Sequence, residues 1–140
     1  MKLKLITLVS LFALGFALNA HAGAVADADT DLVPDQYDNC DGVANGPGEL
    51  SNQVDSDLDG YGNACDADYV DAGFAVNVAD FAIFLAAFQG GPTTVTDHDG
   101  DGATAVSDFA VFLAAFQAPV GSQVGPSGLA CAGVTNPCVP

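Results

Sequence analysis

Aspartate residues recur at one fixed spacing in three separate windows of this sequence. In each window they occupy positions 1, 3, 5 and 12, counted from the first aspartate. The three sets are Asp27, Asp29, Asp31 and Asp38; Asp55, Asp57, Asp59 and Asp66; and Asp97, Asp99, Asp101 and Asp108. At the frequency of aspartate in this chain, such a match is expected only about 0.04 times by accident. Carboxylate oxygens that converge within one loop are the ligands that hard divalent cations prefer. The spacing therefore predicts three metal-binding loops.

The same windows resemble the EF-hand type of calcium loop at further positions. Gly60 and Gly102 stand at position 6, where an EF-hand loop makes its sharp bend. Asp35 and Asn63 stand at position 9 of the first two windows. The resemblance implies calcium as the cofactor, with position 12 closing the ligand shell.

A fourth loop, incomplete in its ligands, precedes Asp80. Counted back twelve positions, it offers Asp71 at position 3 and Asn77 at position 9, but Tyr69 stands at position 1. A count that starts from Asp68 needs a one-residue insertion. Because both counts leave fewer ligands than the other loops have, we expect Asp71, Asn77 and Asp80 to form the weakest site.

Residues 1–22 have the pattern of a secretory signal peptide. Lys2 and Lys4 precede an apolar run, and residues 20–22 form an A-x-A cleavage site. The alternative is a membrane anchor, but the apolar run is short for a span of about 20 residues. No later stretch is long and apolar enough to cross a bilayer. We therefore predict a secreted, extracellular protein, at the cell surface or in a periplasm, with no membrane span after cleavage.

The charge balance limits the partners of the processed chain. Both basic residues lie in the leader, whereas all 18 acidic residues lie beyond it. Such a chain repels nucleic acid and anionic membranes, so we expect neither as a partner. Cations would neutralise the charge, and the excess of Asp over Glu favours them. We expect no enzyme, because no nucleophile has a neighbouring base and a glycosidase would need a deep cleft.

The four cysteines form an even set in an exported chain, which predicts two disulfides. A four-cysteine zinc site is the rival interpretation. It requires closely spaced pairs, but the chain has no C-x-x-C motif, and His98 is the only histidine after the leader. The spacing by itself leaves the connectivity open.

Two segments of nearly identical sequence, 80–89 and 108–117, are predicted helices. Their large apolar residues recur at i, i+3, i+4 and i+7. These residues are Phe81, Phe84, Leu85 and Phe88 in the first segment, and Phe109, Phe112, Leu113 and Phe116 in the second. We expect Asp80 and Asp108 to cap the helices as well as to bind metal. The helices are apolar nearly all round, so they either pack wholly as a core or leave one face for a partner.

The motif DTDLVPDQYDNC, followed by NQVDSDLDGYGNACD, resembles a thrombospondin type 3 repeat over residues 27–68. That family wraps an irregular chain around calcium ions and links neighbouring units by disulfides. The resemblance implies a Cys40–Cys65 bond, which leaves Cys131 and Cys138 as the simplest remaining pair. It departs from the family pattern at Leu32, where glycine is usual.

Residues 68–117 resemble a type I dockerin, which pairs two calcium loop-helix units. The residues that match the partner-facing positions of dockerins are mostly apolar here. They are Val78, Ala79, Leu85 and Ala86 in the first unit, and Val106, Ser107, Leu113 and Ala114 in the second. Any partner surface is therefore expected to be apolar.

The sequence thus predicts a small, mostly irregular chain stabilised by calcium and disulfides. It would contain two short EF-hand-like loop-helix units in an all-α, dockerin-like module. The expected divisions are a signal peptide at 1–22, a type 3-like repeat at 27–68, a dockerin-like domain at 69–117 and a Gly/Pro-rich tail with a disulfide at 118–140. The expected function is a calcium-binding interaction module that docks a cohesin-like or surface protein. The alternative is a structural or adhesive calcium protein of the envelope or matrix, without a dedicated receptor.

Overall fold

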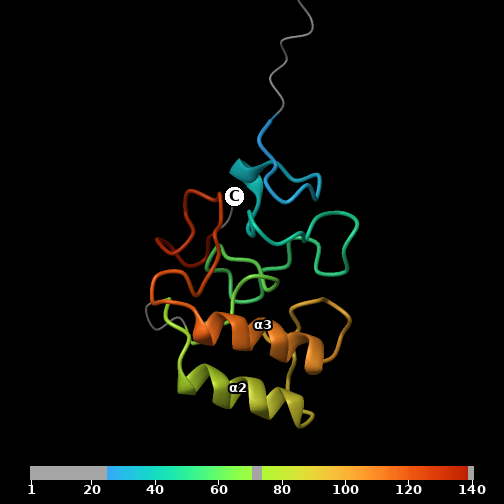
Figure 1. Ribbon diagram of the computed structural model, residues 1–140, viewed down its shortest axis with the longest axis vertical. Helices are drawn as coiled ribbons and strands as arrows, with labels where there is room; N and C mark the ends of the chain where they lie inside the picture. The colour runs from blue at the N-terminus through green and yellow to red at the C-terminus, as the bar shows by residue number, and fades with distance from the viewer. Residues whose placement is uncertain (1–24, 71–73, 139–140) are drawn as a thin grey trace, which may run out of the picture.

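The computed structural model describes residues 25–70 and 74–138 as a chain dominated by turns (Figure 1). Its regular elements are a short 3-10 helix, η2 (Asp35–Tyr37), and two α-helices, α2 (Val78–Phe88) and α3 (Val106–Gln117). No strand occurs within these two ranges, and neither α-helix has the length and hydrophobicity of a membrane span. The coarse fold class is confirmed as small, mostly irregular and disulfide-stabilised. The predicted leader and Asp71 lie outside the described residues.

Both α-helices begin two residues earlier than predicted. Asn77 is the N-cap of α2, and its side-chain oxygen accepts a hydrogen bond from Ala79 N at 2.9 Å. Asp80 therefore occupies the third helical position and accepts from Asn77 N at 2.8 Å. Asp108 does the same at the start of α3, accepting from Ala105 N at 2.8 Å. The prediction that these aspartates cap the helix N-termini is confirmed, although neither of them is the N-cap residue itself. They are the carboxylate half of a capping box, which leaves one oxygen of each free for the preceding loop.

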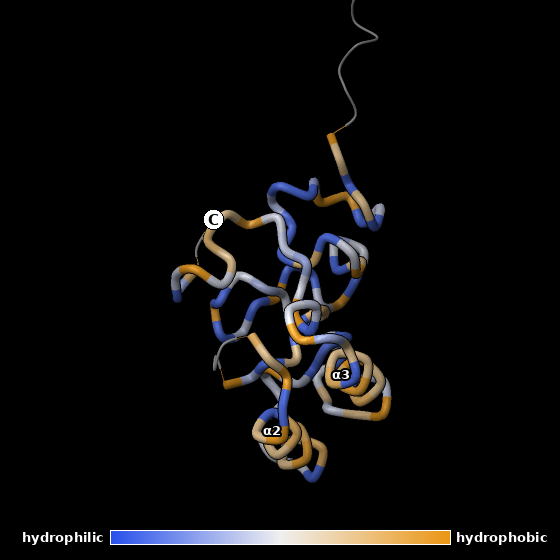
Figure 2. The backbone as a smooth tube through the Cα atoms, turned by 60° about the vertical axis from the view of Figure 1, so that its left-hand side comes forward, coloured by the Kyte–Doolittle hydropathy of each residue, from blue (hydrophilic) through white to orange (hydrophobic). Residues whose placement is uncertain are grey.

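The helices lie side by side and run antiparallel (Figures 1 and 2). The Phe81 ring contacts Phe112 at 5.7 Å between centroids, and Phe84 contacts Phe109 at 5.6 Å. Phe84 and Phe112 are buried with Ala67 and Val76 in the main apolar cluster. This core therefore joins both helices to the chain segment that precedes α2.

Five large side chains of the helices are only half-buried. They are 39% to 47% exposed, and they are Phe81, Leu85, Phe88, Leu113 and Phe116. The apolar stripes are therefore neither wholly core nor wholly exposed. One face of each helix is core, and another remains open to solvent.

The irregular half of the chain is organised around a disulfide. Cys40 is bonded to Cys65, and both pack with Ala64 in a second, small cluster. Cys131 is bonded to Cys138. Both predicted pairings are thus present, and no cysteine remains as a free thiol.

The tail beyond α3 has no regular element up to residue 138, as predicted, but it is folded back onto the irregular half (Figure 1). Gly125 N donates to Cys65 O at 3.1 Å, and Asp41 N donates to Pro126 O at 3.0 Å. Gly128 N donates to Asp38 O at 2.9 Å. The tail is therefore an integral part of the folded body.

Phe112→Ala should lower the free energy of unfolding by about 3–5 kcal/mol, the range for losing a buried phenylalanine. Phe112 is only 1% exposed and contacts rings from both helices. The matched control is Phe116→Ala, on the same helix but 40% exposed, which should cost less than half as much. Urea unfolding followed by circular dichroism measures both. Equal losses would contradict the assignment of Phe112 to the core.

Candidate metal centres

The structure brings carboxylates together at three places, one in each predicted loop. Within each group, one oxygen of every member lies within 4.8 Å of the others. The groups are Asp27, Asp29 and Asp31; Asp55, Asp57 and Asp59; and Asp97, Asp99 and Asp108. Each of these groups has the donors and the spacing to hold a metal ion.

The three loops share one backbone conformation. Position 4 has a positive φ in each, at Thr30 (66°), Leu58 (65°) and Gly100 (76°). Position 6 does too, at Leu32 (79°), Gly60 (99°) and Gly102 (91°). Left-handed backbone is unfavourable for leucine. Leu32 nevertheless adopts the conformation that glycine has in the other two loops, so the first loop keeps the common turn at a local cost.

The first aspartate of each loop holds this turn through its side chain. Asp97 accepts from Gly100 N at 2.8 Å and from Gly102 N at 2.9 Å. Asp55 accepts in the same register, from Leu58 N at 2.7 Å and from Gly60 N at 3.0 Å. These bonds bend each loop around its leading carboxylate.

Asp27 makes weaker bonds of the same kind. It accepts from Asp31 N and from Leu32 N, both at 3.2 Å. The loop that lacks glycine at position 6 is therefore also the one whose leading aspartate is held least tightly.

The aspartates predicted to close the three complete loops are buried. Asp108 lies in its cluster and accepts from His98 N at 2.7 Å. Burial, with a smaller contribution from the nearby carboxylates of Asp59 and Asp57, raises the pKa of Asp66 to about 9. A bound cation would reverse this effect, because it stabilises the charged form of a carboxylate.

Several buried carboxylate oxygens accept no hydrogen bond from the described residues. They are Oδ2 of Asp29, Oδ2 of Asp38, Oδ1 of Asp41 and Oδ1 of Asp68. Burial and the neighbouring Asp31 and Asp38 raise the pKa of Asp29. Buried polar atoms normally have partners, and the chain beyond residue 22 has no Lys or Arg to supply one. The residues present therefore fit a cation.

Several predicted ligands lie outside the clusters, among them Asp38 and Asp66, which were expected to close the first two loops, and Asp35, Asp80 and Asp101. Asp101 is exposed and accepts from Ala103 N at 2.9 Å, outside the group formed by its loop. Asp35 accepts from Ala28 N at 2.8 Å. Asn77 uses its side-chain oxygen as the helix cap. Asp101 and Asp35 hold local turns and Asn77 caps α2, so hydrogen bonding accounts for all three.

The structure favours the count that begins the fourth loop at Asp68. Tyr69 N donates to Asp80 at 2.9 Å, as His98 N donates to Asp108 in the last loop. Since His98 stands second in its loop, Tyr69 also stands second, after Asp68. Asp68 is buried and accepts from Ala75 N at 3.0 Å. Asp68 was not among the predicted metal ligands, although one of the two counts of the fourth loop began there.

A neutral histidine connects three of the loops. Nδ1 of His98 donates to the carbonyl of Asn63, and Nε2 accepts from the Tyr69 hydroxyl at 2.8 Å. This tautomer is assigned because a carbonyl oxygen can only accept a hydrogen bond, so Nδ1 must carry the proton. Burial lowers the pKa of His98, which favours the neutral ring. From the sequence, His98 was expected only to count against a zinc site, as the one histidine beyond residue 22.

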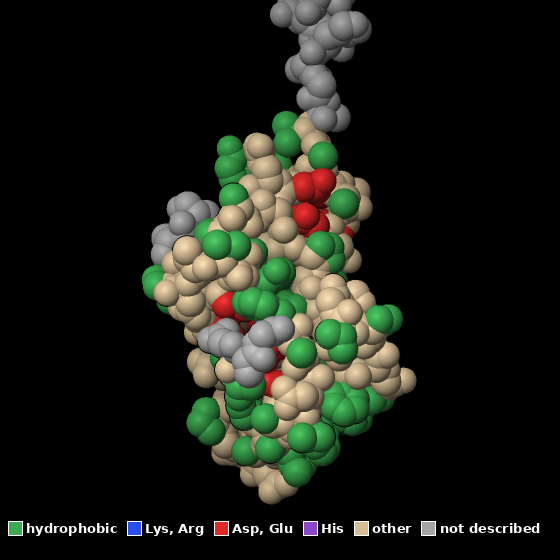
Figure 3. Space-filling model, turned by 90° about the vertical axis from the view of Figure 1, so that its left-hand side faces the viewer, with side chains coloured by type: hydrophobic (Ala, Val, Ile, Leu, Met, Phe, Trp, Pro, Cys, Tyr) green, Lys and Arg blue, Asp and Glu red, His purple; other side chains and the backbone are tan. Residues whose placement is uncertain are grey.

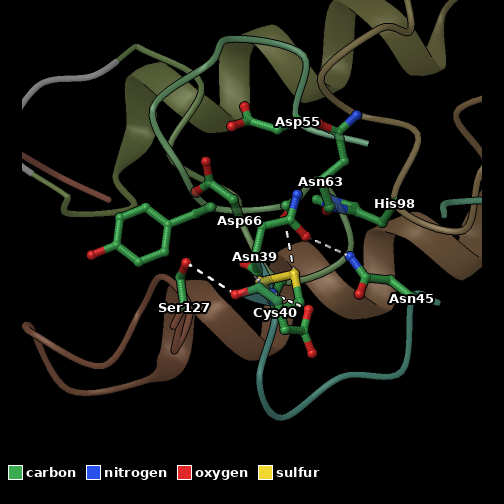
Figure 4. The surroundings of a disulfide bond; sticks show 12 residues. Asn39, Cys40, Asn45, Asp55, Asn63, Asp66, His98 and Ser127 are labelled. Carbon is green, nitrogen blue, oxygen red and sulfur yellow. Dashed lines mark hydrogen bonds between the residues drawn. A yellow bond between two sulfur atoms is a disulfide. The ribbon is translucent and has the colours of Figure 1, made fainter. Parts of the chain in front are cut away.

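Asn63, predicted as a ligand at position 9, also joins segments. Its side chain accepts from Ser56 N at 2.9 Å and donates to Thr94 O at 2.7 Å. Figure 4 shows Asn63 and His98 beside the disulfide of Cys40, with Asp55 and Asp66 nearby. The predicted metal loops and the disulfide thus form one connected body.

An apolar hollow is formed by side chains of both α2 and α3. It encloses about 220 Å³ and is lined by Phe81, Phe84, Leu85, Phe88, Val106 and Phe109. Figure 3 shows hydrophobic side chains gathered over the helical end. The helices therefore present an uncharged surface on a strongly acidic chain.

Comparison with known protein families, with curated proteins and with solved structures gives no match.

His98→Ala should lower the free energy of unfolding by about 2–4 kcal/mol, because it removes two hydrogen bonds and leaves buried partners unpaired. Tyr69→Phe is the matched variant. It keeps the ring but loses one O–H donor, so the cost should be about 1 kcal/mol. Urea unfolding in excess calcium measures both. If both variants unfold at the wild-type midpoint, the His98 link contributes no stability.

Proposed function

We propose that this protein is a secreted calcium-binding module that folds around its ions and presents the apolar helix face to a protein partner, in the manner of a dockerin. The observation that carries the proposal is the set of three carboxylate clusters on loops of one common conformation. The resemblance of residues 27–68 to a thrombospondin type 3 repeat and of residues 68–117 to a dockerin agrees with it.

The donor set favours calcium over zinc. All clustered ligands are carboxylate oxygens, whereas zinc sites in proteins use mainly cysteine and histidine. The four cysteines are disulfide-bonded, and both ring nitrogens of His98 are engaged. Magnesium demands a rigid octahedral shell and keeps several waters, while calcium accepts the irregular oxygen shell of a flexible loop.

Electrostatics explains why folding would depend on the ion. Two carboxylate charges 4.8 Å apart repel by about 0.9 kcal/mol even at the dielectric constant of water. Three pairs in each loop, in three loops, give about 8 kcal/mol before salt screening. That is comparable with the whole stability of a small domain, about 5–15 kcal/mol. Calcium would turn the same carboxylates into ligands.

Chelation of calcium should expand the chain and loosen the helices. Added calcium should restore far-UV circular dichroism and reduce the scattering radius. Asp97→Ala should weaken this response in α3, because Asp97 and Asp108 share a cluster, and α3 contains Asp108. The control is Leu50→Ala, an exposed residue outside the clusters. A protein that is equally compact and helical in chelator would contradict the proposal.

The partner surface is the exposed apolar face of α2 and α3. Its side chains are too exposed to be explained as core alone. Contiguous apolar patches of this kind mark interaction sites in soluble proteins. A cohesin-like or surface protein with an apolar, uncharged face is the partner that fits. The alternative function, a structural or adhesive calcium protein, would need the calcium loops but no receptor.

Leu85→Ser together with Phe88→Ser should abolish association while leaving calcium-dependent folding intact. Both residues line the apolar hollow and are half-exposed. The control is Val120→Ser, exposed and beyond α3. The measurement is a calcium-dependent pull-down from the secreted fraction, with circular dichroism of each variant. If the wild type captures no protein in calcium, the receptor-free alternative is the better account.

A further inference from the structure

The C-terminal segment binds four consecutive backbone carbonyls of one loop. These carbonyls belong to residues 57–60, the turn of the 55–66 loop that carries two of its clustered aspartates. The four bonds are Ser127 Oγ to Gly60 O at 2.7 Å, Gly133 N to Asp59 O at 3.0 Å, Cys138 N to Leu58 O at 2.6 Å and Asn136 Nδ2 to Asp57 O at 3.2 Å. The turn is therefore held from inside by Asp55 and from outside by the tail.

The fit between this turn and the tail depends on Gly60. A Cβ added there would lie 2.6 Å from both Ala132 Cα and Cys138 Sγ. Glycine is thus required at position 60 for two reasons: the backbone there has a positive φ, and the tail approaches too closely to leave room for a side chain. The Cys131–Cys138 disulfide closes the docked segment into a loop of its own.

We propose that residues 127–138 are a positioning part of the 55–66 metal site, so that metal binding and docking of the tail stabilise each other. This inference rests on the proposed calcium binding. Without an ion, Asp55, Asp57 and Asp59 repel one another and favour an open turn. An open turn no longer presents its four carbonyls to the donors of the tail.

The coupling must run in both directions. When only a fraction of the molecules is in the binding-competent form, the apparent affinity is the intrinsic affinity multiplied by that fraction. A docked tail keeps the 57–60 turn in its closed form and so raises the affinity for the ion. By linkage, the ion raises the stability of the docked tail by the same factor.

The last loop provides an internal control. Loop 97–108 packs against a different segment, since a Cβ on Gly100 would meet the backbone of Leu50 and Ser51. Its carboxylate cluster meets the same 4.8 Å limit as that of loop 55–66, although it combines positions 1, 3 and 12 rather than 1, 3 and 5. Removal of its leading aspartate should therefore affect its own metal site and leave the docking of the tail to loop 55–66 unchanged.

The test is hydrogen exchange of the full mature chain, read by mass spectrometry on peptides that cover residues 129–138. In wild type, calcium should slow exchange of the Gly133 and Cys138 amides at least tenfold relative to chelator. Asp55→Ala should abolish this protection, and Asp97→Ala should keep it. Calcium titration by calorimetry supplies the reciprocal measurement. Asn136→Ala should weaken one calcium site about two- to tenfold, the net worth of one hydrogen bond, and Ser122→Ala, earlier in the tail, should not.

Three results would overturn the inference. If calcium increases helicity but leaves exchange in 129–138 unchanged, the tail is not coupled to the site, and the proposed calcium binding survives. Equal loss of protection in Asp55→Ala and Asp97→Ala would show general unfolding rather than a specific link. If calorimetry detects no calcium binding by the wild type, the inference and the proposed function both fail.

Discussion

The structure has to accommodate many carboxylates without any lysine or arginine beyond residue 22. Three groups of aspartates converge to within 4.8 Å, and buried carboxylate oxygens such as Asp38 Oδ2 and Asp68 Oδ1 lack a donor among the described residues. Backbone N–H groups satisfy part of this demand, as at Asp55 and Asp97, but amides carry no net charge. A bound cation is one way to compensate the repulsion, and the carboxylate clusters have the donors to hold one.

The loops do more than collect oxygens. Each bends its backbone through two left-handed residues, and in loop 55–66 the outside of the bend is covered by the tail. Asp80 and Asp108 link loop to helix, because one oxygen binds the backbone before the helix and the other binds the second residue of the loop. His98 then ties the last loop to Asn63 and Tyr69. These contacts hold the three loops in fixed positions relative to one another.

The spacing of aspartates predicted where carboxylates would gather, and the apolar stripes predicted two helices. These features are local, so a linear pattern reports them. The left-handed conformation of Leu32 and Leu58 was not predictable, since it runs against the preference of leucine and is imposed by the common turn. The helix starts were misplaced because an aspartate at the third helical position and an N-cap aspartate look alike in sequence. The docking of the tail was missed because glycine and proline indicate only the absence of regular structure. Nothing in their spacing reveals which carbonyls the segment will bind.

The most direct test of the central claim is to count calcium ions on the mature chain by native mass spectrometry. Wild type should carry three ions in a defined, saturable step. Asp27→Asn, Asp55→Asn and Asp97→Asn should each remove one, since each residue leads a separate cluster. A chain that carries no calcium above the level of nonspecific adducts, or that loses none of its ions in these variants, would contradict the account.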